Sequence, residues 1–299
     1  MTGADGLLLV GHGSVSAEGA AEMRAIGRLV AAALPDVAVD VGFLELADPP
    51  AGQALDRLVA RGCRRIVVLP SVLLAAGHAK SDVPALVLEG RQRHPHLDLR
   101  FGSALGASRV LVAMVGESVL AAGGPGTPLL VVARGSSDPD ANSDAYKVGR
   151  LVAEWTGAPF VHTGFTGVTA PRVPEALDVF ARLGADRVAV AFWFLCTGRL
   201  IDRARRDIAV FTSRTGVAVL DAGYLGPDER LVPVIVGRYR QALAGVPSVN
   251  CDLCAYRAPW PGLEERSGQA VGVGHSQLAA HHRRRHGHDN GHEGGVPAG

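Results

Sequence analysis

Two histidines and a glutamate follow three short apolar segments in the first half of the chain. His12 lies in GHGS after LLLV, Glu45 follows VGFL, and His78 lies in LLAAGHAKSD. Two imidazoles and a carboxylate can bind a borderline divalent ion such as Co²⁺, Fe²⁺, Ni²⁺ or Zn²⁺. These groups can also accept protons near neutral pH. The residue types therefore predict a site that holds a metal ion and removes protons.

Each of these residues also has a purely structural interpretation. His12 can cap a helix or face solvent, Glu45 can cap the next helix, and His78 can simply begin a helix. Ser14, Lys80 and Asp82 lie in the same loops, and helix capping is the role expected for each of them. Ser14 is also a candidate substrate contact.

The chain repeats its own pattern, and the three residues survive in only one copy. LLLVGHGS at 7–14 recurs as LLVVARGS at 129–136. At the matched positions Arg134 replaces His12, Gly167 replaces Glu45, and Arg199 replaces His78 after a shift of one residue. Structural roles should persist in both copies, so the joint loss favours a functional role for the three residues of the first copy.

Short apolar segments and helical spacing predict the elements that position these residues. Strands are expected at 6–10, 38–44, 65–70, 98–101, 128–133, 159–165, 187–195 and 217–220. Near-continuous apolar strands separated by helices indicate parallel sheets covered on both faces. The predicted fold class is α/β, with two homologous lobes, each a four-stranded parallel sheet flanked by helices, and a cleft between them. Ligands bind at the carboxyl ends of such strands, where the three side chains can converge.

Composition shifts divide the chain into three predicted parts. The turn-rich GGPGTP segment separates a catalytic lobe at 1–124 from a degenerate lobe at 125–247. Residues 248–299 contain one CxxC, formed by Cys251 and Cys254, and a His-rich tail without the makings of a core. We expect this tail to be disordered without metal. It is either a metal reservoir or a solvated tail.

Charge and hydropathy exclude several classes of partner. The net charge of the 299 residues is +1, which argues against nucleic acid. The longest apolar segment is too short to cross a bilayer, and no secretory signal is visible. GHGS is neither a Walker A sequence nor a complete GxGxxG, so a nucleotide cofactor is not expected. We expect the protein to be a cytoplasmic monomer. We also expect Cys63 and Cys196 to be buried small hydrophobic residues, and residues 192–194 to lie in the core.

Three ordered motifs carry a family resemblance. GHGS, FLELADPP and LLxxGHAxxDVP resemble motifs of the class II tetrapyrrole chelatases, over about residues 6–245. The pattern is most similar to the sirohydrochlorin cobaltochelatase group, CbiX, and its ferrochelatase relatives. The resemblance implies ATP-independent insertion of Co²⁺ into sirohydrochlorin for cobalamin synthesis, with metal and proton-transfer roles at His12, Glu45 and His78. Insertion of Fe²⁺ for sirohaem is the alternative.

The resemblance also gives the remaining segments possible roles. The substrate that the resemblance implies is a polycarboxylate, and Arg134 and Arg199 are candidates to bind it because guanidinium groups match carboxylates. Surface or interlobe salt bridging is their alternative role. CDLCAYR followed by a His-rich tail is similar to the end of some long family members, although a single CxxC needs further ligands to hold Fe–S or zinc.

Two functions of other classes compete with the chelatase. A non-catalytic protein that stores or delivers cobalt or nickel would depend on residues 262–299 and would tolerate the loss of His12. A hydrolase built on GHGS is disfavoured, because no nucleophile–base pair is visible at that loop.

Overall fold

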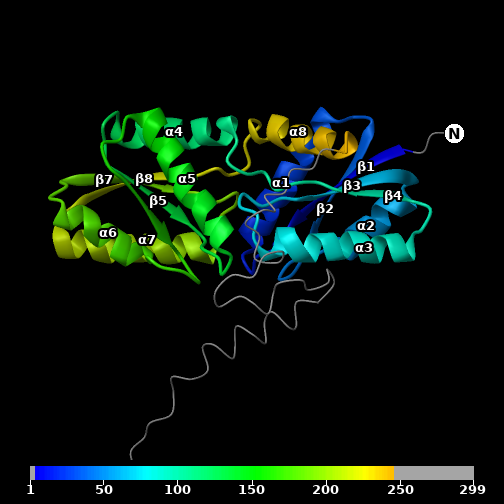
Figure 1. Ribbon diagram of the computed structural model, residues 1–299, viewed down its shortest axis with the longest axis horizontal. Helices are drawn as coiled ribbons and strands as arrows, with labels where there is room; N and C mark the ends of the chain where they lie inside the picture. Colours follow the sequence, from blue (N-terminus) through cyan, green and yellow to red (C-terminus); the bar gives the residue numbers. More distant parts are fainter. Residues whose placement is uncertain (1–3, 246–299) are drawn as a thin grey trace, which may run out of the picture.

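The computed structural model describes residues 4–245, which form two four-stranded parallel sheets side by side (Figure 1). The first sheet has the order β2-β1-β3-β4 and the second the order β6-β5-β7-β8. The strands are β1 (Ala4–Gly11), β2 (Val37–Phe43), β3 (Cys63–Pro70), β4 (Asp98–Phe101), β5 (Leu129–Ala133), β6 (Val161–Phe165), β7 (Arg187–Phe192) and β8 (Ala218–Tyr224). The equal strand orders confirm the predicted α/β fold with two homologous halves.

Helices cover both faces of each sheet. They are α1 (Ala17–Ala33), α2 (Ala51–Ala60), the short π-helix η1 (His78–Asp82), α3 (Val83–Arg93), α4 (Arg109–Gly123), α5 (Pro139–Thr156), α6 (Val173–Arg182), α7 (Arg199–Thr215) and α8 (Leu231–Leu243). None of the helices in the described part of the chain is both long and apolar enough to cross a membrane.

The strand predicted at 187–195 is shorter in the structure. β7 ends at Phe192, because the N–H of Phe194 turns back to the carbonyl of Phe192. Phe192 and Trp193 are buried, as predicted, whereas Phe194 is only half-buried.

The last helix of each repeat crosses to the other sheet. Figure 1 shows α4 over the second sheet, where it packs on α5, β7 and β8. In return, α8 lies over the first sheet, against α1, β3 and β4. The packed lobes therefore exchange one helix relative to the sequence repeats, and the boundary at 124/125 stays a prediction that concerns the repeats.

One hydrophobic cluster continues through both lobes. Along β1, Leu7 and Leu9 face this shared cluster with α1, while Leu8 and Val10 face a separate cluster with α2 and α3. This is the alternation that a strand imposes on a sheet covered on both faces. In the second sheet, Val131 of β5 joins the shared cluster, and Val132 packs toward α6 and α7. The two lobes therefore share one hydrophobic core.

The loops after β1 and β2 are joined through their backbones. The N–H of Glu45 donates to the carbonyl of His12 at 3.1 Å. Gly13 has a φ of 96°, and a β-carbon there would overlap the carbonyl oxygen of Glu45. The second repeat has the same arrangement, with Gly135 against the carbonyl oxygen of Gly167. A residue without a β-carbon is therefore required where the two loops meet.

We expect Gly13→Ala to lower the free energy of unfolding by more than the about 1–3 kcal/mol that a left-handed residue costs, because steric overlap adds to backbone strain. Urea unfolding followed by circular dichroism measures the loss. Gly62→Ala is the matched control, since Gly62 has a φ of 84° but no atom within 4 Å of its missing β-carbon. Equal losses in the two variants would contradict the role given to the close approach.

Candidate active site

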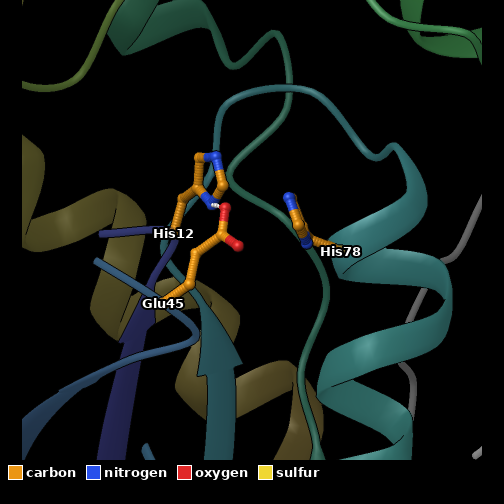
Figure 2. A group of neighbouring side chains, drawn as sticks. All are labelled: His12, Glu45 and His78. Carbon is orange, nitrogen blue, oxygen red and sulfur yellow. Dashed lines mark ion pairs between the residues drawn. The ribbon is translucent and has the colours of Figure 1, made fainter. Parts of the chain in front are cut away.

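The side chains of His12, Glu45 and His78 converge at the carboxyl ends of the first sheet (Figure 2). One ligand atom from each residue lies within 4.8 Å of the others. Nδ1 of His12 is 3.3 Å from Oε1 of Glu45, and the two imidazole rings have centroids 4.3 Å apart. The structure thus brings together the three residues that the sequence singled out.

The topology explains why these residues meet. His12 follows β1, Glu45 follows the neighbouring strand β2, and His78 begins η1 beyond the end of β3 on the other side of β1. Their side chains are between 20% and 32% exposed. This exposure leaves part of each side chain accessible to a ligand, although Nδ1 of His12, the atom nearest Glu45, is itself buried. Two imidazoles and a carboxylate at this spacing suit a divalent ion.

Asp82 holds the ring of His78. Oδ2 of Asp82 lies 2.6 Å from Nδ1 of His78, four residues earlier in the same short helix. The N–H of Val83 donates to the carbonyl of His78, which makes this turn a π-turn. Because Nδ1 contacts Asp82, Nε2 is the ring nitrogen that would bind an ion or take a proton. π-turns of this kind are frequent at functional sites.

The expected helix-capping roles were wrong for three residues. Asp82 contacts His78 and makes no side-chain cap at α3. Ser14 accepts from the N–H of Ser16 at 3.0 Å, and it is Ser16 that caps α1. Lys80 is buried against the second lobe, where Nζ lies 2.8 Å from Asp138 and 2.7 Å from Asp140. A capping assignment considers only the local sequence, and each of these side chains has instead found a partner outside a cap.

The environment of Lys80 keeps its amine protonated. Burial by itself would lower the pKa of Lys80, but the hydrogen bonds and charges of Asp138 and Asp140 outweigh it and raise the pKa above its ordinary value. Lys80 is therefore a structural cation in the interface between the lobes, close in the chain to His78.

A cleft of about 390 Å³ separates the carboxyl ends of the two sheets. Its polar lining includes the sequence-predicted residues His12, Ser14, His78, Arg134 and Arg199. Met23, Leu73, Trp193 and Leu195 add apolar surface to it. Glu45 lies in the adjoining loop and contacts His12 from there. The cleft thus combines polar groups of both lobes with apolar walls.

Arg134 faces the first lobe across the cleft. The surrounding protein lowers the pKa of Arg134, and the negative charge of Glu45 acts in the opposite direction. Within residues 4–245, no carboxylate lies within ion-pair distance of Arg134 or Arg199, so the salt bridges considered for them are not formed there. Arg199 is the first residue of α7 and is exposed. Both guanidinium groups are accessible to an anionic ligand.

The two described cysteines are not poised for thiolate chemistry. Cys63 is buried, as expected, and burial raises the pKa of its thiol. Cys196 is only half-buried by exposure, yet burial and the charge of Glu22 raise the pKa of its thiol to about 12. Cys251, Cys254 and the His-rich tail lie outside the described residues.

Sequence reasoning missed two kinds of contact. The spacing of Asp82 from His78, one helical turn apart, is a local signal that could have suggested their pairing. The partners of Lys80 are 58 and 60 positions away and belong to the other repeat. No local pattern identifies such partners.

The fold and site define a class of two-lobed α/β proteins. One lobe carries His12, Glu45 and His78, a group that could hold a metal ion, and the other lobe contributes Arg134 and Arg199 to the same cleft. The CbiX family model matches residues 6–122 and 128–242, one copy for each repeat. The chain belongs to the CbiX family.

Relatives named as cobaltochelatases and as ferrochelatases are both similar to the chain along most of its length. A sirohydrochlorin cobaltochelatase of Priestia megaterium is 36% identical over 258 residues, which covers 84% of each chain. A sirohydrochlorin ferrochelatase of the same organism is 27% identical and covers 80% of this chain and 91% of its own.

Solved structures show the same architecture. SirB from Bacillus subtilis with Fe³⁺ has a TM-score of 0.72 at 25% identity, covering 81% of this chain and 96% of that one. The sirohydrochlorin chelatase SirB from Bacillus subtilis subspecies spizizenii, in complex with cobalt, has a TM-score of 0.69 at 22% identity, with the same coverages. The second likeness concerns the fold alone.

Removing the contact between Asp82 and His78 will weaken metal binding. We expect Asp82→Ala to lower Co²⁺ affinity about 10- to 100-fold, the usual effect of losing a carboxylate behind a ligating histidine. A Co²⁺ titration followed by the visible absorption of the ion measures it. Asp36→Ala removes an exposed carboxylate of the same lobe and is the control. Equal affinities of the Asp82 and Asp36 variants would mean that the contact does not orient His78.

Proposed function

We propose that the protein is a sirohydrochlorin chelatase that inserts a divalent metal ion into the tetrapyrrole without ATP. The observation that carries the proposal is the cluster of His12, Glu45 and His78, whose ligand atoms lie within 4.8 Å of one another. The proposal draws further support from the chain's membership of the CbiX family and from its similarity to chelatases named for both cobalt and iron.

The proposed reaction exchanges one divalent ion for two protons. The ion enters the macrocycle, its bonds to the ring nitrogens form, and the two pyrrole N–H protons leave. His12 and His78 hold the incoming ion on the open face of the ring. Glu45, paired with His12 at 3.3 Å, collects the protons with one of the imidazoles. No nucleotide is needed, because the macrocycle itself provides the binding energy for the metal.

We assign the second lobe to the substrate's acid groups. Where the first repeat has His, Glu and His, the second has Arg134, Gly167 and Arg199. Two cations without the carboxylate favour an anion over a metal ion, and arginine forks match carboxylates. Ser14 lines the same cleft and adds a hydroxyl from the first lobe. Residues 1–124 are then the catalytic repeat and 125–247 the supporting one.

Co²⁺ is the proposed metal, for cobalamin synthesis. The cobaltochelatase relative is 36% identical, compared with 27% for the ferrochelatase. The ligand types do not decide between Co²⁺ and Fe²⁺, since supply and affinity order matter more. Fe²⁺ insertion for sirohaem is therefore the alternative. We further propose that the enzyme acts as a cytoplasmic monomer.

Metal insertion can be followed by the absorbance change of sirohydrochlorin in anaerobic mixtures with Co²⁺ or Fe²⁺. We expect His12→Ala and His78→Ala to slow insertion about 100-fold or more, because each removes a metal ligand or proton acceptor. His96→Ala is the control, an exposed histidine of the same lobe. No acceleration over the spontaneous rate with either metal would refute the chelatase.

The same assay separates the chelatase from a storage or delivery protein. Deleting residues 262–299 should leave the insertion rate nearly unchanged if the cluster is the active site. A protein that merely stores cobalt or nickel would lose most of its function in this deletion and keep it in His12→Ala.

Arginine variants test the substrate assignment. We expect Arg134→Met and Arg199→Met to raise the KM for sirohydrochlorin about tenfold, with little change in kcat, because each removes a charge-assisted hydrogen bond to bound substrate. Arg203→Met is the control, since Arg203 is exposed on α7 but does not line the cleft. A fall in kcat at constant KM would instead place the two arginines in the chemical step.

A further inference from the structure

Two contacts join the lobes beside the cleft. In one, Lys80 of η1 reaches the start of α5 in the other repeat. In the second, Thr197, just before α7, meets Glu22 of α1. In both cases the first helix of one repeat holds the segment that follows the third strand of the other. The contacts thus join corresponding elements of the two repeats, although the residues stand at different positions of the repeat and their chemistry differs.

The first contact is ionic and buried. The side chains of Lys80, Asp138 and Asp140 are only 1%, 1% and 3% exposed. Oδ1 of Asp138 accepts the N–H of Asp140, so Asp138 is fixed at the start of α5 while its Oδ2 binds Lys80. The positive end of the helix dipole offsets the second carboxylate.

Stability alone does not account for this ion cluster. Taking charges out of water costs more than most buried pairs return, and apolar replacements are often as stable or more so. At the position matched to Lys80 the second repeat has Ile201, which is fully buried in the cluster of its own sheet with α6 and α7, so that repeat does without a charged residue there. What the ionic contact adds is a fixed geometry, since both bonds to Nζ have defined lengths and directions.

The fixed position of Lys80 also constrains His78, one of the three residues of the candidate metal site. Lys80 is two residues from His78, within the same five-residue π-helix, and Asp82 in that helix contacts the His78 ring. A short hydrogen-bonded helix moves as a unit. Anchoring Lys80 on α5 therefore fixes the position from which His78 reaches into the cleft.

The second contact is made by a carboxylate between two donors. Oε2 of Glu22 accepts the N–H of Thr197 at 2.7 Å, and Oε1 accepts the hydroxyl of Tyr224 at 2.6 Å. Burial and this hydrogen bond raise the pKa of Tyr224 to about 12, so the hydroxyl stays a donor. A β-carbon at Gly19 would lie 2.5 Å from the Thr197 carbonyl oxygen, so α1 and this loop pack backbone to backbone. Thr197 precedes Arg199 by two residues.

We propose that each lobe positions the functional side chain of the other: Asp138 and Asp140 fix His78 through Lys80, and Glu22 fixes Arg199 through Thr197. The assignment of metal to His78 and of substrate to Arg199 rests on the proposed function. Lys80 and Glu22 are positioning residues, because neither touches the reacting atoms.

Lys80→Met tests the ionic contact, alone and combined with Asp138→Asn and Asp140→Asn. We expect Lys80→Met to lower kcat and Co²⁺ affinity about 10- to 100-fold, with the KM for sirohydrochlorin nearly unchanged. It should also lower the Tm, since it leaves two buried carboxylates unpaired. The triple variant should recover the Tm but keep the low kcat and low Co²⁺ affinity. Recovery of all three values would show that the contact serves stability alone and would overturn the proposal.

Glu22→Ala and Tyr224→Phe test the second contact. We expect Glu22→Ala to raise the KM for sirohydrochlorin about tenfold through the displaced Arg199 loop, with kcat and Co²⁺ affinity within about twofold of the wild type. Tyr224→Phe removes one of the two donors and should give a smaller change in KM. Glu22→Gln keeps one acceptor oxygen, so its KM for sirohydrochlorin should lie between those of the wild type and Glu22→Ala. A loss of kcat without a change in KM would overturn this half of the proposal.

Hydrogen exchange of the full-length protein without metal provides a readout independent of catalysis. Residues 71–82 should exchange faster in Lys80→Met and residues 193–200 faster in Glu22→Ala, each without a change in the other segment. Lys147→Met is the matched control, because Lys147 forms an exposed ion pair with Asp144 on α5. Unchanged exchange in both segments overturns the positioning roles. Absence of chelatase activity in the wild type would refute the proposed function and leave this result valid.

Discussion

The hydrophobic core shared by the two lobes is the constraint on which the cleft depends. Residues of α1, α4, α5 and α8 pack with strands of both sheets into one cluster, and α4 and α8 each cross to the opposite sheet. A lobe that separated from its partner would expose this apolar surface, at roughly 25 cal/mol for each Å². The distance between the two sets of strand ends is therefore set by core packing. The groups that line the cleft can be placed for a ligand before one arrives.

Much of this arrangement was readable from the sequence. Apolar segments located the strands, and the repeat with its altered residues located the cluster of His12, Glu45 and His78 at the strand ends. These inferences succeeded because parallel strands in a covered sheet have a simple pattern and a fixed polarity. The end of β7 was misplaced, since Trp193 and Leu195 remain apolar after the chain has left the sheet.

Contacts between the repeats were not readable in this way. The local sequence of α4 and α8 does not indicate that they cross to the opposite sheet, because an apolar helix face has the same pattern whichever sheet it covers. Lys80 looked like an ordinary polar residue near the start of a helix, and its burial follows only from the approach of Asp138 and Asp140. Sequence patterns report which face of an element is apolar. They do not report which distant element will cover it.

The repeat also shows how one backbone supports opposite charges. The turns at Gly13 and Gly135 have similar left-handed conformations, and each meets the carbonyl oxygen of its neighbouring loop. These turns fix where the side chains of His12 and Arg134 start, and the side chains decide what can bind. In the first repeat the carboxylate of Glu45 adds a negative charge beside two imidazoles. In the second, Gly167 contributes no charge, so the arginines create a positive field instead. Burial lowers the pKa of Arg134, whereas the charge of Glu45 acts to raise it, so the charged groups of the two repeats act on each other across the cleft. A cation held by the first repeat and acid groups held by the second would therefore each offset the charge that the other brings.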